Sequence, residues 1–149
     1  MLRAYACYDK EIGYCQGMNY LAAIILLIIE DEEMSFFVFV SIMYCNKWRD
    51  IYKPQMSKLI MLLGNLEKCI KENLSEINQK FIENNIQVNG QFAHFYLTIF
   101  GYLIPLNFTV RIIDLFFLEN EGLIKRVLLN ILKLERTKIL NLQQQVFLK

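Results

Sequence analysis

Proline and glycine are scarce in this sequence, with 2 and 6 among 149 residues. This scarcity excludes collagen-like and linker-rich architectures, which depend on those two residues. Histidine is scarcer still, because His94 is the single one, and this limits histidine-based metal or acid–base chemistry to one position. The sequence also has no large excess of either charge, since it contains 16 Lys and Arg and 15 Asp and Glu. A net charge of +1 argues against a dedicated nucleic-acid-binding protein, which normally carries a basic face.

Long hydrophobic runs are absent, although 55% of the residues are hydrophobic. A membrane-spanning helix needs about 20 consecutive apolar residues. The longest runs are shorter or are interrupted by a glycine and a proline: residues 21–29, 36–44 and 95–106. We therefore expect buried core helices, no transmembrane segment, and no signal peptide at residues 1–10. The alternative of a helical membrane-associated protein stays open because of the high apolar content and the basic residues that follow Leu123.

The four cysteines form no C-x-x-C pair and fit no common zinc motif. We therefore expect free thiols in or near the core of a protein from a reducing compartment. A cysteine hydrolase that pairs Cys15 with His94 is an alternative that no local sequence signature supports.

Apolar residues recur at three- and four-residue spacing or in short runs, which indicates helices rather than strands. The expected helix starts are an Asn73-Leu-Ser-Glu76 capping box and Asn107 as an N-cap. The acidic run at residues 30–33 is expected to form a charged turn before the next helix. We predict a single all-α domain of irregular helices, with one ending near Asp9 and others over residues 19–29, 34–48, 54–71, 74–84, 91–100, 108–117 and after Gly122.

Several side chains in these helices have both a structural and a functional interpretation. Arg111 and Asp114 are three residues apart on one face, and we expect a structural ion pair that holds helices together. For Tyr44, Trp48 and Tyr52 we expect core packing, with an aromatic partner-binding surface as the alternative. The helix at 19–29 is apolar on nearly all sides and is expected to be buried. The last helix is expected to pack through Ile124, Val127, Leu128, Ile131 and Leu134.

The segment Gly13-Tyr14-Cys15-Gln16-Gly17-Met18-Asn19 carries the most information about function. Two glycines bracket a glutamine just before an apolar helix, and glycines allow sharp turns and the close approach of another molecule. The amide of Gln16 can donate and accept hydrogen bonds, as is needed to orient a water molecule for attack on phosphorus. Gln16 could equally satisfy backbone groups at the helix start, and the spacing alone does not decide between these roles.

Residues 12–23, Ile-Gly-Tyr-Cys-Gln-Gly-Met-Asn-Tyr-Leu-Ala-Ala, resemble the glutamine-finger segment of TBC domains, the catalytic domains of Rab GTPase-activating proteins. Residues 2–9 resemble the helix that leads into that segment. Two later stretches, residues 95–100 and residues 110–122, resemble the W-F-L-T-L-F and R-I-W-D-x-F-F…E-G stretches of the family. The three segments occur in the family's order.

The resemblance implies an irregular multi-helix TBC-type fold with two lobes and a Rab-family small GTPase as partner. It implies that Gln16, with Tyr14 in the family's Y-x-Q motif, is the catalytic glutamine that orients the hydrolytic water on the partner's GTP. Gly13, Gly17, Met18 and Asn19 are then expected to shape the loop and bind the partner. GTP and Mg²⁺ would be held by the GTPase, so no cofactor or metal of the chain's own is expected. The chain would activate a partner rather than hydrolyse GTP itself.

The resemblance also implies a role in vesicle trafficking and a cytoplasmic location, with peripheral association with endomembrane surfaces left open. One family feature is missing, because the arginine finger lies in an upstream I-x-x-D-x-x-R motif that does not occur in these 149 residues. We expect residues 1–134 to form an N-terminally truncated TBC domain, followed by a C-terminal helical tail at 135–149. An arginine finger is worth about 10³–10⁵ in rate, so we expect little activity from the chain as written. The alternative is a catalytically silent TBC-like scaffold that binds a Rab or another protein.

Overall fold

The computed structural model describes residues 1–141 of the chain. Its regular elements within that range are all helical, which confirms the predicted fold class. They are α1 (Leu2–Tyr8), α2 (Met18–Ile29), α3 (Glu32–Tyr44), the 3₁₀ helix η1 (Trp48–Tyr52), α4 (Ser57–Asn73), α5 (Ser75–Glu83), α6 (Val88–Thr98), α7 (Leu106–Glu119), α8 (Gly122–Leu134) and α9 (Arg136–Leu140).

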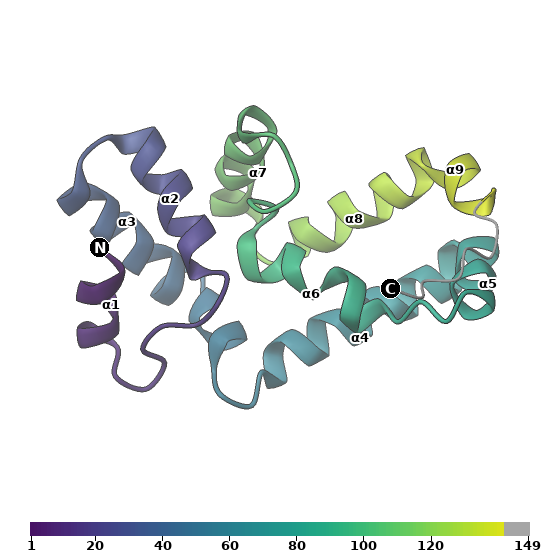
Figure 1. The fold of residues 1–149 in the computed structure, drawn as a ribbon, viewed down its shortest axis with the longest axis horizontal. Coiled ribbons are helices and arrows are strands. Elements are labelled where there is room, and N and C mark those ends of the chain that lie inside the picture. Colours follow the sequence, from purple (N-terminus) through teal and green to yellow (C-terminus); the bar gives the residue numbers. More distant parts are fainter. Residues whose placement is uncertain (142–149) are drawn as a thin grey trace, which may run out of the picture.

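The helices form two groups along the longest axis of the molecule (Figure 1). One group contains α1, α2 and α3, and it includes the N-terminus. The other contains α4, α5, α8 and α9, with α5 packed on α9 and α4 packed on α5. Helix α6 joins the groups because it packs on α4 and on α2, while α7 contacts α2 and α8. The turn between α1 and α2 therefore lies in the first group, whose helices α2 and α3 contact α6 and η1, respectively.

The hydrophobic core runs through both groups and is rich in aromatic side chains. Tyr5 packs edge-on against Phe39 with ring centroids 5.0 Å apart, and Trp48 packs against Phe116 in the same way at 4.8 Å. All four are fully buried. Edge-to-face pairs of this kind add about 0.5–1.5 kcal/mol to the burial of their area. They tie α1 to α3 and η1 to α7, which are far apart in the sequence.

Several expected helix ends are wrong. The helix expected over 34–48 ends at Tyr44, because Lys47 takes a left-handed conformation with φ of 55° and Trp48 opens a separate 3₁₀ helix. Asn73 is not the cap of α5 but the last residue of α4, where its Nδ2 donates to the carbonyl of Cys69 at 2.9 Å. Asn107 lies inside α7, which begins directly after Pro105.

One helix start follows the expected physical pattern. The carboxylate of Asp31, in the acidic turn, accepts a hydrogen bond from the backbone N–H of Met34 at 2.7 Å and caps α3. Glu32 and Glu33 occupy the first turn of the same helix, where negative charge interacts favourably with the helix dipole.

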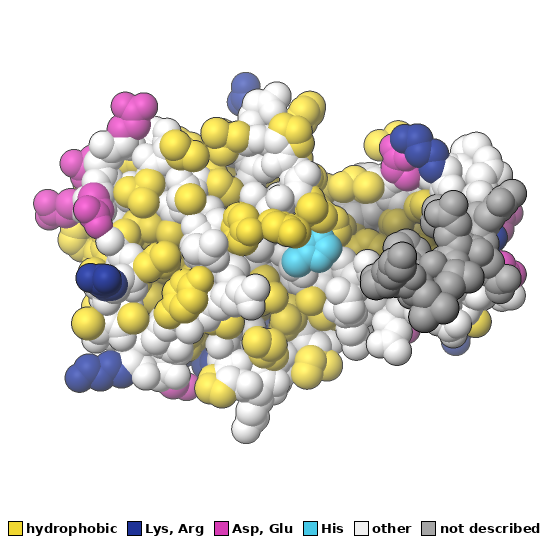
Figure 2. All heavy atoms as spheres, viewed as in Figure 1, with side chains coloured by type: hydrophobic (Ala, Val, Ile, Leu, Met, Phe, Trp, Pro, Cys, Tyr) yellow, Lys and Arg dark blue, Asp and Glu magenta, His cyan; other side chains and the backbone are white. Residues whose placement is uncertain are grey.

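Two predicted apolar faces are exposed in part. In α2, Leu21, Ile24 and Ile25 are buried, but Leu27 and Ile28 point to solvent, so the helix is not buried on all sides. In α8 the core is made by Leu123, Ile124, Leu128 and Leu132, whereas Leu134 is 83% exposed. Figure 2 shows apolar side chains spread widely over one face of the molecule. No helix within residues 1–141 is long and apolar enough to cross a membrane.

The first part of the expected C-terminal tail at 135–149 contains α9. The rest of this tail, residues 142–149, lies outside the described residues. The proposed domain boundary at residue 134 stays a prediction.

Candidate functional site

Gln16 lies on the turn that joins α1 to α2, and this turn is shaped by two glycines. The N–H of Gly13 donates to the carbonyl of Asp9 at 2.7 Å, and Gly13 itself has φ of +63°. Gly17 has φ of +107° and lies directly against α6, where an added Cβ would approach the Leu97 carbonyl oxygen to 2.9 Å. Only glycine meets both demands at position 17, because left-handed geometry and this close approach exclude a side chain.

Several polar groups of the turn are hydrogen-bonded to residues other than Gln16. The side-chain Oδ1 of Asn19 accepts from the N–H of Gly17 at 3.3 Å and from the hydroxyl of Tyr14 at 3.4 Å. The N–H of Met18 donates to the carbonyl of Cys15 at 3.2 Å. Gln16 is exposed, and its side chain has no hydrogen-bond partner among residues 1–141. The helix-start role thus falls to Asn19, and the donor and acceptor of Gln16 are both open to another molecule.

A hollow of about 500 Å³ opens beside Gln16, between the turn, α2 and α6. No charged side chain lines it, since its described lining consists of Cys15, Gln16, Gly17, Tyr20, Met56, Gly90, Ala93, His94, Leu97, Thr98 and Tyr102. The site therefore offers the amide of Gln16 beside a mixed wall of apolar, hydroxyl and imidazole side chains, with no Asp, Glu, Lys or Arg.

Cys15 and His94 both line this hollow, but they do not form a reactive pair. Burial raises the pKa of the Cys15 thiol and lowers the pKa of the His94 imidazole. Both shifts favour the neutral forms, whereas a nucleophilic cysteine needs a lowered pKa. The Nε2 atom of His94 is buried without a hydrogen-bond partner in the described chain. His94 thus lines a groove, and its hydrogen-bonding capacity is not fully used within the described chain.

A buried ion pair that the sequence did not predict lies beside the start of the turn. Asp9 is 3% exposed and follows α1 directly. Its Oδ2 accepts from Arg49 Nε at 2.7 Å, and its Oδ1 accepts from Arg49 Nη2 at 3.0 Å. The hydroxyls of Tyr5 and Tyr44 each donate to Oδ2 at 3.1 Å. Hydrogen bonds from Arg49 and the two tyrosines outweigh the effect of burial and lower the pKa of Asp9 to about 2.

No local pattern links Asp9 with Arg49, because 40 positions separate them. The surrounding sequence offers no signal either, because Arg49 lies between Trp48 and Asp50 in a stretch that also contains Lys47. Trp48 and Tyr52 are in the core as expected, and the Tyr52 hydroxyl donates to the Leu97 carbonyl at 2.6 Å. Tyr44 remains 42% exposed.

The ion pair expected between Arg111 and Asp114 is absent. Both residues are exposed on α7, and neither has an ion-pair partner within residues 1–141. Three-residue spacing brought them to one side of the helix, but that side faces solvent, where such pairs form weakly.

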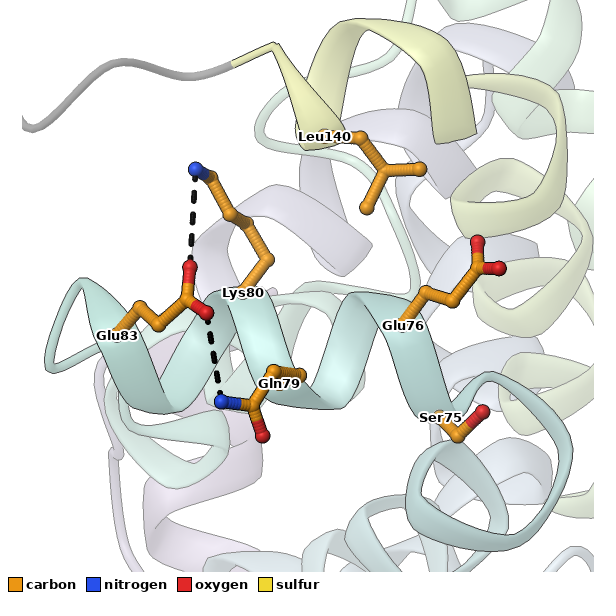
Figure 3. A pocket seen from close by; sticks show the side chains of 6 residues that line it. All are labelled: Ser75, Glu76, Gln79, Lys80, Glu83 and Leu140. Atoms are coloured by element: carbon orange, nitrogen blue, oxygen red, sulfur yellow. Dashed lines mark hydrogen bonds and ion pairs between the residues drawn. The ribbon is translucent and has the colours of Figure 1, made fainter.

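Two further features of the described chain bear on its chemistry, a second hollow and the lack of a metal site. No three His, Cys, Asp or Glu side chains within residues 1–141 are grouped as a metal site would require. A second hollow lies between α5 and α9, lined by Ser75, Glu76, Gln79, Lys80, Glu83 and Leu140 (Figure 3). There Lys80 pairs with Glu83 at 3.8 Å, and Gln79 Nε2 donates to the same carboxylate at 3.3 Å. These groups bind one another along α5 and do not converge on the hollow.

Comparison with known proteins matches the whole described part of the chain. The family model for the Rab-GTPase-TBC domain matches residues 1–140. The chain is 30% identical over 149 residues to the Ecotropic viral integration site 5 ortholog of Drosophila melanogaster, covering 100% of this chain and 18% of that protein. It is 31% identical over 149 residues to Rab GTPase-activating protein eat-17 of Caenorhabditis elegans, covering 100% of this chain and 17% of that protein.

A yeast protein is similar to the same extent. The GTPase-activating protein GYP5 of Saccharomyces cerevisiae is 31% identical over 140 residues, which cover 93% of this chain and 16% of that protein. The chain thus spans less than a fifth of the length of these relatives.

Proposed function

The chain belongs to the Rab-GTPase-TBC domain family, and from this we propose that it binds a GTP-loaded Rab-family small GTPase and promotes hydrolysis of the bound GTP. Two of the similar proteins carry GTPase activation in their names. The partner would hold GTP and Mg²⁺, and the chain would contribute side chains from its surface.

The observation that carries the proposal is the exposed, unpartnered amide of Gln16 on a turn that is held by hydrogen bonds to Asn19 and by the packing of Gly17 against α6. One amide can accept a hydrogen bond from a water molecule and donate another to a phosphoryl oxygen. Orienting the attacking water is the task that a glutamine performs in GTP hydrolysis. Tyr14 supports the turn through Asn19, and Gly13, Gly17 and Met18 give it the shape in which Gln16 projects.

Charge neutralisation is the task that residues 1–141 do not provide at this site. The hollow beside Gln16 has no charged lining, and Arg49 is occupied by Asp9 and Glu11. An arginine finger contributes about 10³–10⁵ in rate, or roughly 4–7 kcal/mol of barrier. We therefore propose that residues 1–149 alone accelerate hydrolysis weakly and that an arginine outside this stretch supplies the remainder.

The test is single-turnover GTP hydrolysis across a panel of GTP-loaded Rab GTPases, with residues 1–149 and with the natural full-length polypeptide that contains them. We expect Gln16→Ala to lower the stimulated rate of the full-length polypeptide by about a hundredfold, because the water loses its orientation. The matched control is Gln79→Ala, an exposed glutamine on α5, which should leave the rate unchanged. An unchanged rate in Gln16→Ala contradicts the role of Gln16. Acceleration by residues 1–149 alone of more than about a hundredfold contradicts the need for an outside arginine.

The second candidate function is a scaffold that binds a Rab or another protein without accelerating hydrolysis. The uncharged hollow beside Gln16 favours it. Retention of a GTP-loaded Rab on the immobilised full-length polypeptide, without faster hydrolysis and without an effect of Gln16→Ala, would establish this function. For either function we propose a cytoplasmic location at endomembrane surfaces, which fractionation of cells would test.

A further inference from the structure

We propose that Arg49 is a positioning residue for Gln16, acting through the buried carboxylate of Asp9 without contacting the partner or its GTP. This inference rests on the proposed function of Gln16. The group formed by Tyr5, Asp9, Glu11, Tyr44 and Arg49 is called the Arg49 brace below. It joins α1, the Gln16 turn, α3 and η1 in one hydrogen-bonded cluster.

The brace holds the N-terminal end of the turn at two points. Arg49 forks onto both oxygens of Asp9 and also pairs with Glu11, two residues farther along the turn. Asp9 holds the backbone in return, because its carbonyl accepts from Gly13 N–H at 2.7 Å and its Oδ1 accepts from Ile12 N–H at 3.4 Å. The guanidinium therefore governs the direction in which the chain leaves α1 for Gln16.

The other end of the turn is held by packing instead of charge. Gly17 lies against Leu97 of α6, and the Tyr52 hydroxyl donates to the carbonyl of Leu97 at 2.6 Å. Arg49 and Tyr52 are both in η1. This one short helix thus supports the turn at its start and, through α6, at its end.

The planar fork of arginine is essential to this arrangement. A guanidinium bonds two carboxylates with fixed geometry, whereas a lysine ammonium supplies a point charge on a flexible stem. Arg49→Lys therefore keeps the positive charge next to Asp9 but removes the bidentate geometry. We expect the fold to persist and the turn to lose its fixed direction.

The first experiment is amide hydrogen exchange of the full-length polypeptide with Arg49→Lys. We expect exchange at residues 12–17 to rise about tenfold or more, since local opening frees these amides, with α4 to α8 unchanged. The matched control is Arg136→Lys, which alters the exposed ion pair with Glu76 in the other helix group. Unchanged exchange at residues 12–17 in Arg49→Lys would overturn the proposal.

The second experiment separates positioning from partner binding. In single-turnover hydrolysis with a responsive Rab, Arg49→Lys should lower the maximal stimulated rate by about tenfold to a hundredfold, as a small misplacement does. The activator concentration at half-maximal rate should change less than about threefold, because the binding surface is retained. A higher half-maximal concentration with an unchanged maximal rate would overturn positioning and assign Arg49 to binding.

A double variant guards against loss of folding. Removing one member of a buried pair leaves an uncompensated charge and destabilises the fold strongly, whereas replacing both members with neutral groups is often tolerated. Asp9→Asn with Arg49→Met should therefore fold and show the same rise in exchange and the same fall in maximal rate. If Gln16→Ala is silent, the proposed function fails. If Gln16→Ala abolishes stimulation while both brace variants retain it, only the positioning role fails.

Discussion

Asp9 keeps its negative charge while 3% exposed, because five hydrogen bonds replace the water that it lost on folding. Its pKa falls from the ordinary 3.8 to about 2, with the Arg49 hydrogen bonds as the largest cause. That difference corresponds to roughly 2 kcal/mol of stability at neutral pH. Because the folded-state pKa is the lower one, this stability is present above pH 3.8 and is lost as the pH falls toward about 2.

We predict that Asp9→Asn removes this pH dependence. The difference in free energy of unfolding between the unaltered chain and Asp9→Asn should shrink by about 1 kcal/mol between about pH 6 and pH 3, the part of the effect titrated by then. Urea unfolding followed by the fluorescence of Trp48, the single tryptophan, measures both proteins. Parallel pH profiles of the two proteins would show that Asp9 is not held by the brace.

The position of the Gln16 turn was predictable from the sequence, whereas contacts between residues far apart in the chain were not, and the catalytic role of Gln16 stays a proposal. The Gln16 turn was identified because its glycines and its glutamine are neighbours in the chain. The Asp9–Arg49 pair was missed because helix spacing carries no information about contacts between residues 9 and 49. Arg111 was placed in an ion pair by spacing alone, and the structure leaves it in solvent.

At the scale of elements, the helices themselves follow from apolar periodicity, but their ends do not. Asn73 and Asn107 have the side chains of good caps, yet one closes α4 and the other lies within α7. Other groups occupy the cap positions, because Pro105 directly precedes α7 and the side chain of Asn73 donates to the Cys69 carbonyl within α4. The existence of an element is therefore better encoded in local sequence than its boundary.

Gly17 in the turn and Gly64 in α4 should change the stability of the protein in opposite directions when each is replaced by alanine. We predict that Gly17→Ala lowers the free energy of unfolding by about 1–3 kcal/mol, because φ is +107° and the new Cβ meets the Leu97 carbonyl at 2.9 Å. The matched control, Gly64→Ala within α4, has nothing within 4 Å of the new Cβ. It should raise stability by about 0.5–1 kcal/mol through helix propensity. Urea unfolding measures both free energies of unfolding. An unchanged value for Gly17→Ala would show that α6 does not pack closely against the turn.

At the scale of the whole molecule, apolar side chains are exposed around α7 in unusual number. They come from this helix and the turn before it: Tyr102, Leu103, Leu106, Phe108, Leu115, Phe117 and Leu118. Figure 2 shows apolar surface on the region where Figure 1 places α7. Monomeric proteins rarely expose large contiguous apolar patches, so this region should promote self-association in solution.

We predict that Phe108→Ser with Leu118→Ser reduces self-association and the binding of a hydrophobic dye. Both side chains are exposed, at 60% and 79%, so the free energy of unfolding should change by less than about 0.5 kcal/mol each. Analytical ultracentrifugation and dye fluorescence measure these effects. Phe116→Ser, at a fully buried position of the same helix, should instead destabilise by about 3–5 kcal/mol. Dye binding that persists in the double variant would place the association surface elsewhere.

We propose that the direction in which Gln16 points is set by Arg49, Tyr52 and Leu97, which belong to η1 and α6. A free peptide of residues 13–19 would carry every letter of the motif and none of these supports. Grafting that stretch onto another helical scaffold would likewise transfer the glutamine without the contacts that we propose orient it. We therefore expect that moving the proposed function to another protein requires Arg49 and the packing surface of α6 together with the motif, and that a copy of the motif alone is inactive.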